Sequence, residues 1–187
     1  LRGSENGQKV DDKRVISSVS RCLNPYEKAG YEAMMELAAS DELEIIVSNT
    51  TEAGIQYDPS CKKDDCPPSS FPAKLTQVLY HRYQAGKKGI IMLACELIDN
   101  NGKELLKCVN QYIEQWGLED GFKKYVNEDC TFCGSLVDRI VPGRIRDEKE
   151  VAELEQKHGY ADPLLDVGEV FGVWVIEGDE KLNDVLP

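Results

Sequence analysis

Residues 44–54 carry the sequence EIIVSNTTEAG, and residues 90–102 carry IIMLACELIDNNG. In each stretch a short apolar run breaks into a polar turn. Such runs are typical of strands that are buried on both faces of a parallel sheet. The polar turns then follow the carboxyl ends of neighbouring strands, which is the edge where open α/β sheets bind ligands. The two stretches therefore predict Asn, Thr and Glu side chains along one sheet edge.

The chain has 187 residues, of which 41% are hydrophobic, so it is long and apolar enough for a globular domain with its own core. Its net charge of −12 repels phosphate groups and anionic lipids, so we expect no nucleic-acid partner and no membrane contact. No apolar run is long enough to cross a bilayer. The opening Leu1-Arg2-Gly3-Ser4 is not typical of a natural start, and we expect the chain to be a fragment.

Seven cysteines without a dense disulfide pattern favour a reducing compartment, and we expect a cytoplasmic protein. Cys130 and Cys133 have the spacing of a zinc knuckle, and Cys61 with Cys66 would complete a four-thiolate site. The second pair has the wrong spacing and no histidine near it. A thioredoxin-like redox pair is equally weak, because no strand leads directly into Cys130. We therefore predict no metal site and keep a cysteine-ligated metal protein as the weakest alternative.

The apolar pattern predicts an alternation of strands and helices, which implies a parallel sheet with right-handed crossovers. The expected elements are a strand at 14–19, a helix at 26–39, a strand at 44–47, a polar loop at 58–70, a helix from Ser70 to Gly86, a strand at 90–94 and a helix from Gly102 to Gly117. A short amphipathic piece around Phe122, a charged helix at 147–157 and a β-rich run at 170–176 follow.

Four motifs occur in order along the chain: SNTTEAGI at 48–55, SFPAKLT at 70–76, CELIDNNG at 95–102 and SLVDRIV at 135–141. Together they resemble the sugar-acid branch of the long-chain mannitol dehydrogenase family. The resemblance implies a Rossmann-type, mostly parallel α/β domain that binds NAD. It places the remainder of this NAD-binding domain in residues 1–134. Residues 135–187 would continue the sheet and lead to a helical C-terminal domain.

The activity that the resemblance implies is a metal-independent, NAD-dependent reduction of a hexuronate, D-tagaturonate to D-altronate. Where mannitol dehydrogenases carry Cys-Asp-Asn-Ile, this chain has Cys95-Glu96-Leu97-Ile98. The substrate-binding role of that asparagine does not transfer to Leu97, and the difference favours the sugar-acid branch. An oxidoreductase for fructuronate or a polyol, and a non-catalytic nucleotide-binding domain, are the alternatives.

The chain also departs from the family. The Gly-rich phosphate loop of the first strand is missing, and no such loop follows any expected strand. The lysine that acts as acid and base in the family, with its Asn and His companions, matches no position here. We therefore assign no catalytic residue and expect the 187 residues alone to be inactive.

The expected cofactor contacts are Asn49, Thr50, Thr51 and Glu52, which follow the first of the two buried strands. Asn101 is the expected substrate contact, because the wider family also has Asn-Gly at this point. Asn and Thr also favour local hydrogen bonds in turns, so capping of the next turn is the alternative for Asn49, Thr50 and Thr51. The alternative for Glu52 is an ordinary turn carboxylate, and the alternative for Asn101 is a plain turn sequence.

Overall fold

The computed structural model describes residues 1–178 and 180–186. The described chain forms two compact units: one comprises residues 1–20 and 137–174, and the other comprises residues 21–136 and 175–187. The predicted division after residue 134 concerns the domains of a dehydrogenase, and it stays a prediction. The two units are described separately below.

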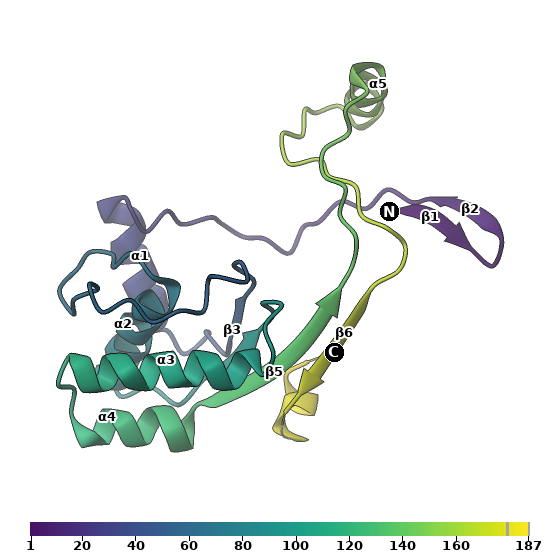
Figure 1. The fold of residues 1–187 in the computed structure, drawn as a ribbon. Helices are drawn as coiled ribbons and strands as arrows, with labels where there is room; N and C mark the ends of the chain where they lie inside the picture. The colour runs from purple at the N-terminus through teal and green to yellow at the C-terminus, as the bar shows by residue number, and fades with distance from the viewer. Residues whose placement is uncertain (179, 187) are drawn as a thin grey trace. The chain divides into compact units, whose positions relative to one another are not determined.

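The larger unit is built on a sheet with the strand order β3-β4-β5-β6. Its strands are β3 (Ile45–Ser48), β4 (Ile91–Ala94), β5 (Thr131–Asp138) and β6 (Val173–Glu177). β3 pairs with β4 and β4 pairs with β5, both in parallel. In Figure 1, β6 points in the opposite direction to β5. The prediction of a mostly parallel α/β sheet is confirmed.

Helices connect these strands as the apolar periodicity predicted. They are α1 (Lys28–Ala38), α2 (Phe71–Gln84), α3 (Asn101–Gln115) and α4 (Asp120–Lys124), which continues into the π-helical turn η1 (Tyr125–Asp129). A short 3-10 helix, η2 (Glu180–Asp184), follows β6. The start of α2 is fixed locally, because the Ser70 hydroxyl accepts a hydrogen bond from the Ala73 N–H. None of the helices described is both long and apolar enough to span a membrane.

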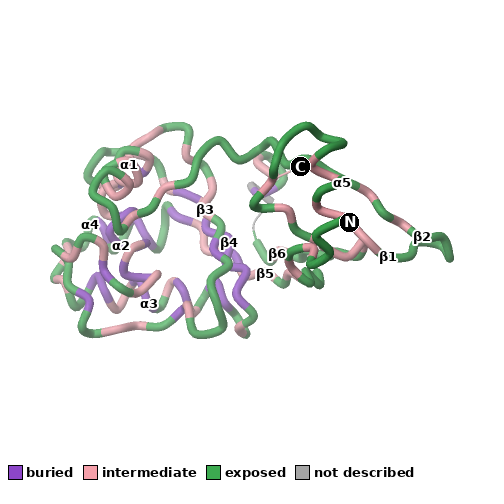
Figure 2. The backbone as a smooth tube through the Cα atoms, turned by 90° about the horizontal axis from the view of Figure 1, so that it is seen from above, coloured by how far each residue is buried: buried purple, intermediate pink, exposed green. Residues whose placement is uncertain are grey.

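The core lies between the sheet and helices α2, α3 and α4, where buried residues gather in Figure 2. β4 is buried along most of its length because it has a strand on each side and α3 packs on it. The largest fully buried side chains of this core are Leu79, Met92, Leu105, Val109, Ile113, Phe122 and Val126.

The prediction that both apolar runs are buried on both faces is right for β4 and wrong for β3. Val47 of β3 leaves 53% of its surface exposed. β3 stands at the end of the strand order and so has a neighbour on one side only. A strand at the edge of a sheet lacks the second neighbouring strand that a central strand has, so more of its surface stays exposed.

In the smaller unit, β1 (Arg2–Glu5) and β2 (Gln8–Asp11) form an antiparallel hairpin. Its two-residue turn is Asn6-Gly7, with φ angles of 51° and 79°. Asn-Gly is the favoured pair for a turn in which both residues have positive φ, so the sequence carries a local signal for this hairpin, which was not predicted. The charged helix predicted at 147–157 is α5 (Glu148–His158), capped by the Asp147 carboxylate. The β-rich run at 170–176 is a strand only from Val173 onward.

The strand predicted at 14–19 is wrong, because these residues are neither helix nor strand. Val15, Ile16 and Val19 are 68%, 71% and 67% exposed. Their β-branched side chains favour extended backbone, but a strand also needs a hydrogen-bonded neighbour. No strand of the described chain pairs with this segment.

Candidate functional site

The carboxyl ends of β3 and β4 lie side by side in the larger unit, next to the middle of β5. Ser48 at the end of β3 pairs with Ala94 at the end of β4, and Ala94 pairs with Gly134 of β5. The polar turns after β3 and β4 therefore meet at one edge of the sheet, as the sequence predicted. We call the residues 48–54, 94–102 and 134–135 the sheet edge.

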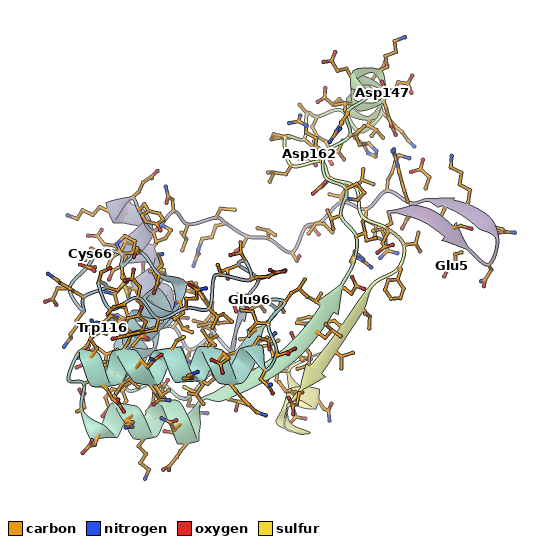
Figure 3. The ribbon with its side chains drawn as sticks, in the orientation of Figure 1. Glu5, Cys66, Glu96, Trp116, Asp147 and Asp162 are labelled. Atoms are coloured by element: carbon orange, nitrogen blue, oxygen red, sulfur yellow. The ribbon has the colours of Figure 1, made fainter. Side chains whose placement is uncertain are left out.

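Glu96 occupies the centre of the sheet edge, and only 3% of its surface is exposed. Its Oε2 accepts a hydrogen bond of 2.9 Å from the Ser48 hydroxyl. Its Oε1 accepts two bonds from Thr50, one of 3.0 Å from the backbone N–H and one of 2.8 Å from the hydroxyl. Figure 3 labels this side chain beside the turn that follows β3. The buried carboxylate thus fixes the turn after β3 to the turn after β4.

Asn101, the predicted substrate contact, is also buried, with 2% of its surface exposed. Its amide nitrogen donates to the carbonyl oxygens of Glu96 (2.9 Å) and Ser135 (2.8 Å). Its amide oxygen accepts from the N–H groups of Gly102 (2.8 Å) and Ser135 (3.0 Å). The side chain therefore joins the turn after β4 to β5 and to the start of α3. Its substrate-binding role stays a prediction.

Gly102 allows the start of α3 to lie directly on β5. A Cβ at this position would stand 2.6 Å from both the carbonyl carbon and the oxygen of Cys133, and 2.7 Å from the Gly134 nitrogen. Real Cβ atoms do not approach backbone atoms this closely. The Asn-Gly pair at 101–102 is thus required by packing: the asparagine makes the hydrogen bonds and the glycine leaves the space.

Thr50, a predicted cofactor contact, is held from two directions. Glu96 accepts both of its donors, and Gly54 lies so close that a Cβ there would clash with the Thr50 hydroxyl oxygen. The Gly54 N–H also closes the turn by donating to the Thr51 carbonyl oxygen at 2.8 Å. The hydroxyl of Thr50 is therefore held in one orientation at an exposed position of the turn.

Asn49, Thr51 and Glu52, the other predicted cofactor contacts, are exposed at the sheet edge. Within the described residues, their side chains form no hydrogen bond or ion pair. The structure thus brings the four predicted cofactor residues into one turn, with three of the side chains open to solvent. The amide of Asn49 and the hydroxyl of Thr51 suit the hydroxyl and carboxamide groups of a dinucleotide, and the Glu52 carboxylate can accept a hydrogen bond from a ribose hydroxyl, so the turn fits NAD chemically.

Glu96 and Ser135 lie inside two of the four sequence motifs, but their residue types alone predicted no role for them. Glu96 follows β4 by two residues, and an acidic residue at the carboxyl end of a buried strand is a signal that could have singled it out. The Ser135 hydroxyl donates to the Ala94 carbonyl oxygen at 2.6 Å, and so holds the end of β4 to the middle of β5. Neither link is visible without the pairing of the strands.

The cysteines do not assemble into a metal site. Cys130 and Cys133 are buried at the start of β5, Cys61 is buried beside Tyr112, and Cys66 is exposed. Across residues 1–178 and 180–186, no three His, Cys, Asp or Glu side chains gather as they would around a metal ion. The described structure therefore does not bring the four thiols of that alternative together.

The burial of the thiols predicts their reactivity. Cys22 and Cys66 are exposed, and the other five cysteines are buried. Burial also raises the pKa of the Cys108 and Cys130 thiols, which keeps them protonated and unreactive at mildly alkaline pH. We expect brief treatment of the native protein with iodoacetamide at pH 8 to label Cys22 and Cys66 alone, as mass spectrometry of its peptides would show. Rapid labelling of Cys130 would contradict the burial of β5, and labelling of all seven after denaturation is the control.

Comparison with known proteins places this fold in a family. The family model of the mannitol dehydrogenase Rossmann domain matches residues 3–186. The chain belongs to this family. Mannitol 2-dehydrogenase of Pseudomonas fluorescens was solved as a ternary complex with NAD and D-mannitol, and it superposes on this chain with a TM-score of 0.70. The superposition covers 87% of this chain and 34% of the mannitol 2-dehydrogenase chain, and the two sequences are 23% identical. The expected Rossmann-type fold is thereby confirmed.

The chain is also similar in sequence to altronate oxidoreductases from several bacteria. Altronate oxidoreductase of Phocaeicola vulgatus is 44% identical over 191 aligned positions, and that of Bacillus subtilis is 45% identical over the same length. Both matches cover 100% of this chain and 39% of the relative. The chain thus spans about two fifths of the length of these relatives.

Proposed function

We propose that this chain is part of an enzyme that reduces D-tagaturonate to D-altronate with NADH. The observation that carries the proposal is the 42–45% identity to altronate oxidoreductases over the whole chain. The family likeness and the open polar turn at the sheet edge support it. The cytoplasm, where thiols stay reduced and NADH is available, is the proposed location.

The proposed role of the sheet edge is to bind and orient the cofactor. When bound, NADH supplies the hydride that the substrate carbonyl carbon accepts. Asn49, Thr50, Thr51 and Glu52 would hold the cofactor by hydrogen bonds, and Asn101 would keep the turn after β4 in place next to the substrate. A rigid edge serves this purpose because hydride transfer needs the two reacting carbons in contact and aligned.

We further propose that the proton donor lies outside residues 1–187. Glu96, the buried carboxylate of the sheet edge, has both oxygens occupied by Ser48 and Thr50 and is not available to a substrate. The chain alone should therefore not turn over the substrate.

The test is an NADH oxidation assay of the full-length natural protein with D-tagaturonate, D-fructuronate and D-fructose as alternative substrates, together with an NAD+ reduction assay with D-mannitol. Preference for D-tagaturonate supports the proposal. Preference for fructuronate or a polyol would assign the chain to another branch of the family, and NADH binding without turnover of any substrate would favour a non-catalytic domain. The 187-residue chain is assayed beside it, and turnover by this chain would contradict the proposed position of the proton donor.

Asn49 tests the cofactor role of the turn. We expect Asn49→Ala in the full-length natural protein to weaken NADH binding by about 1–2 kcal/mol, the usual effect of removing one hydrogen-bonding partner. The melting temperature should stay unchanged, because the side chain is exposed and forms no hydrogen bond within the described residues. The measurement is isothermal titration with NADH alongside thermal unfolding. Unchanged affinity with a lower melting temperature would make Asn49 a structural turn residue.

A further inference from the structure

We infer that Glu96 is a positioning residue for cofactor binding, acting through Thr50. The inference rests on the proposed function, in which the turn after β3 holds NADH. It starts from an unusual feature of the sheet edge: a carboxylate that is 97% buried and that makes no ion pair within 4.0 Å in the described chain. Burial of a carboxylate is unfavourable unless hydrogen bonds replace its water. The Glu96 carboxylate accepts three hydrogen bonds, and all three come from Ser48 at the end of β3 and from Thr50 in the turn that follows.

One carboxylate oxygen of Glu96 binds the end of β3, and the other binds the turn that follows. Oε2 accepts from Ser48, which is the last residue of β3 and is itself buried. Oε1 accepts from both donors of Thr50, which lies two residues further on and is exposed. The carboxylate is therefore fixed at one oxygen by the rigid sheet, and with the other oxygen it holds the first exposed turn residues in place.

This arrangement also sets what Thr50 can recognise. Its hydroxyl proton is committed to Glu96, because a carboxylate only accepts hydrogen bonds. The Thr50 oxygen then has lone pairs to offer and no proton to donate. A ligand group that binds there must be a donor, such as a ribose hydroxyl or a carboxamide N–H. The turn would thus favour a hydrogen-bond donor of the cofactor at this point, because the polarity of one hydroxyl group is fixed.

The main chain of Glu96 extends the connection to the other side of the site. Its carbonyl oxygen accepts from the Asn101 amide, which in turn bonds to Ser135 of β5. The side chain of one residue therefore holds the proposed cofactor turn, while its carbonyl holds the proposed substrate side. A change in the Glu96 side chain should affect NADH binding first, since the carbonyl bond remains.

The first experiment measures NADH dissociation constants of the full-length natural protein and its variants well below their melting temperatures. Glu96→Met keeps the length of the side chain and removes both acceptors, and we expect about tenfold weaker binding. Glu96→Gln keeps one oxygen for Thr50 and can donate to the Ser48 oxygen, so it should restore affinity to within about twofold. Glu104→Gln, which neutralises a partly exposed carboxylate of α3 that forms an ion pair with Lys107, is the control for charge alone. Equal weakening in Glu96→Met and Glu96→Gln would overturn the inference.

A double-mutant cycle separates positioning from general damage. Thr50→Val keeps the shape of Thr50 and removes its hydroxyl, while Thr50→Ser keeps the hydroxyl. If Glu96 acts through Thr50, the losses from Glu96→Met and Thr50→Val should be less than additive, because Thr50→Val removes the hydroxyl bond to Glu96 and keeps the backbone N–H bond. Additive losses would show that Glu96 affects the protein by another route and would overturn the inference. If Glu96→Met does not fold, the same question is decided by Thr50→Val and Thr50→Ser, of which only the first should weaken binding.

Amide hydrogen exchange of the ligand-free protein tests the positioning role of Glu96 without relying on the proposed function. The Thr50 N–H should exchange slowly in the natural protein and in Glu96→Gln, and quickly in Glu96→Met. If the natural protein fails to bind NADH, the proposed function is wrong, while this exchange pattern still decides whether Glu96 positions the turn. Unchanged Thr50 exchange in Glu96→Met would overturn the inference whatever the ligand.

Discussion

Phe122→Ala is expected to lower the free energy of unfolding by about 4 kcal/mol, the usual effect of emptying a large aromatic site in a core. The Phe122 side chain of α4 has 0% of its surface exposed. Its ring centroid lies 5.1 Å from that of Tyr80, 5.5 Å from that of Tyr83 and 6.2 Å from that of Tyr125. These three rings come from α2 and from the turn after α4, and side chains of this size cannot close over the space that the lost ring would leave.

The measurement is equilibrium unfolding in urea, with both the midpoint and the slope compared. Phe122→Leu is the matched control: it keeps most of the apolar volume and should lower the free energy of unfolding by about 1 kcal/mol. A small loss in both variants would mean that α4 does not pack on the core as described.

Gly102→Ala is expected to lower the free energy of unfolding by about 2–3 kcal/mol. In most helices this change is favourable by nearly 1 kcal/mol, because alanine has the higher helix propensity. Here the new Cβ would stand 2.6–2.7 Å from backbone atoms of Cys133 and Gly134, which cannot turn aside as a side chain can. The start of α3 would have to move away from β5, and the Asn101 bonds to Ser135 would lengthen with it.

Gly134→Ala serves as the comparison for Gly102→Ala, because it changes the residue on the other side of the same contact. Its Cβ would meet the Asn101 and Glu177 side-chain oxygens at 3.4 Å, an ordinary contact distance. We expect its urea midpoint to stay close to that of the natural protein. If Gly102→Ala were as stable as Gly134→Ala, the close approach of α3 to β5 would be wrong.

Most of the fold was predictable because the relevant signals are local. The apolar runs at 45–47 and 90–94 gave β3 and β4, and the helical spacing between and after them gave α2 and α3. Ser70 followed by Phe71-Pro72 marked the start of α2 to the residue, since capping and the fixed φ of proline act within one turn of chain. The strand–helix alternation was then enough for a parallel sheet.

The failures concern partners that lie far away in the sequence. Residues 14–19 have the composition of a strand, and Val47 lies in an apolar run that is typical of a buried strand. Both are exposed, because the neighbouring chain that the prediction assumed is not packed against them. A strand gains its stability from the chain beside it, and composition does not record whether that neighbour is present.

The sheet edge also combines features that local sequence determines with features that depend on contacts between distant parts of the chain. The sequence by itself placed Asn49, Thr50, Thr51 and Glu52 in a turn after a strand, and it placed Asn101 at the next one, because strand ends and turn residues are local features. Only the tertiary structure decided that Glu96 and Asn101 are buried and that Asn49 is open. The parallel pairing of Ser48 with Ala94 brings the Glu96 carboxylate to Thr50, a residue 46 positions away in the chain. A buried polar group must find its hydrogen-bond partners in space, so its role follows from the pairing of the strands.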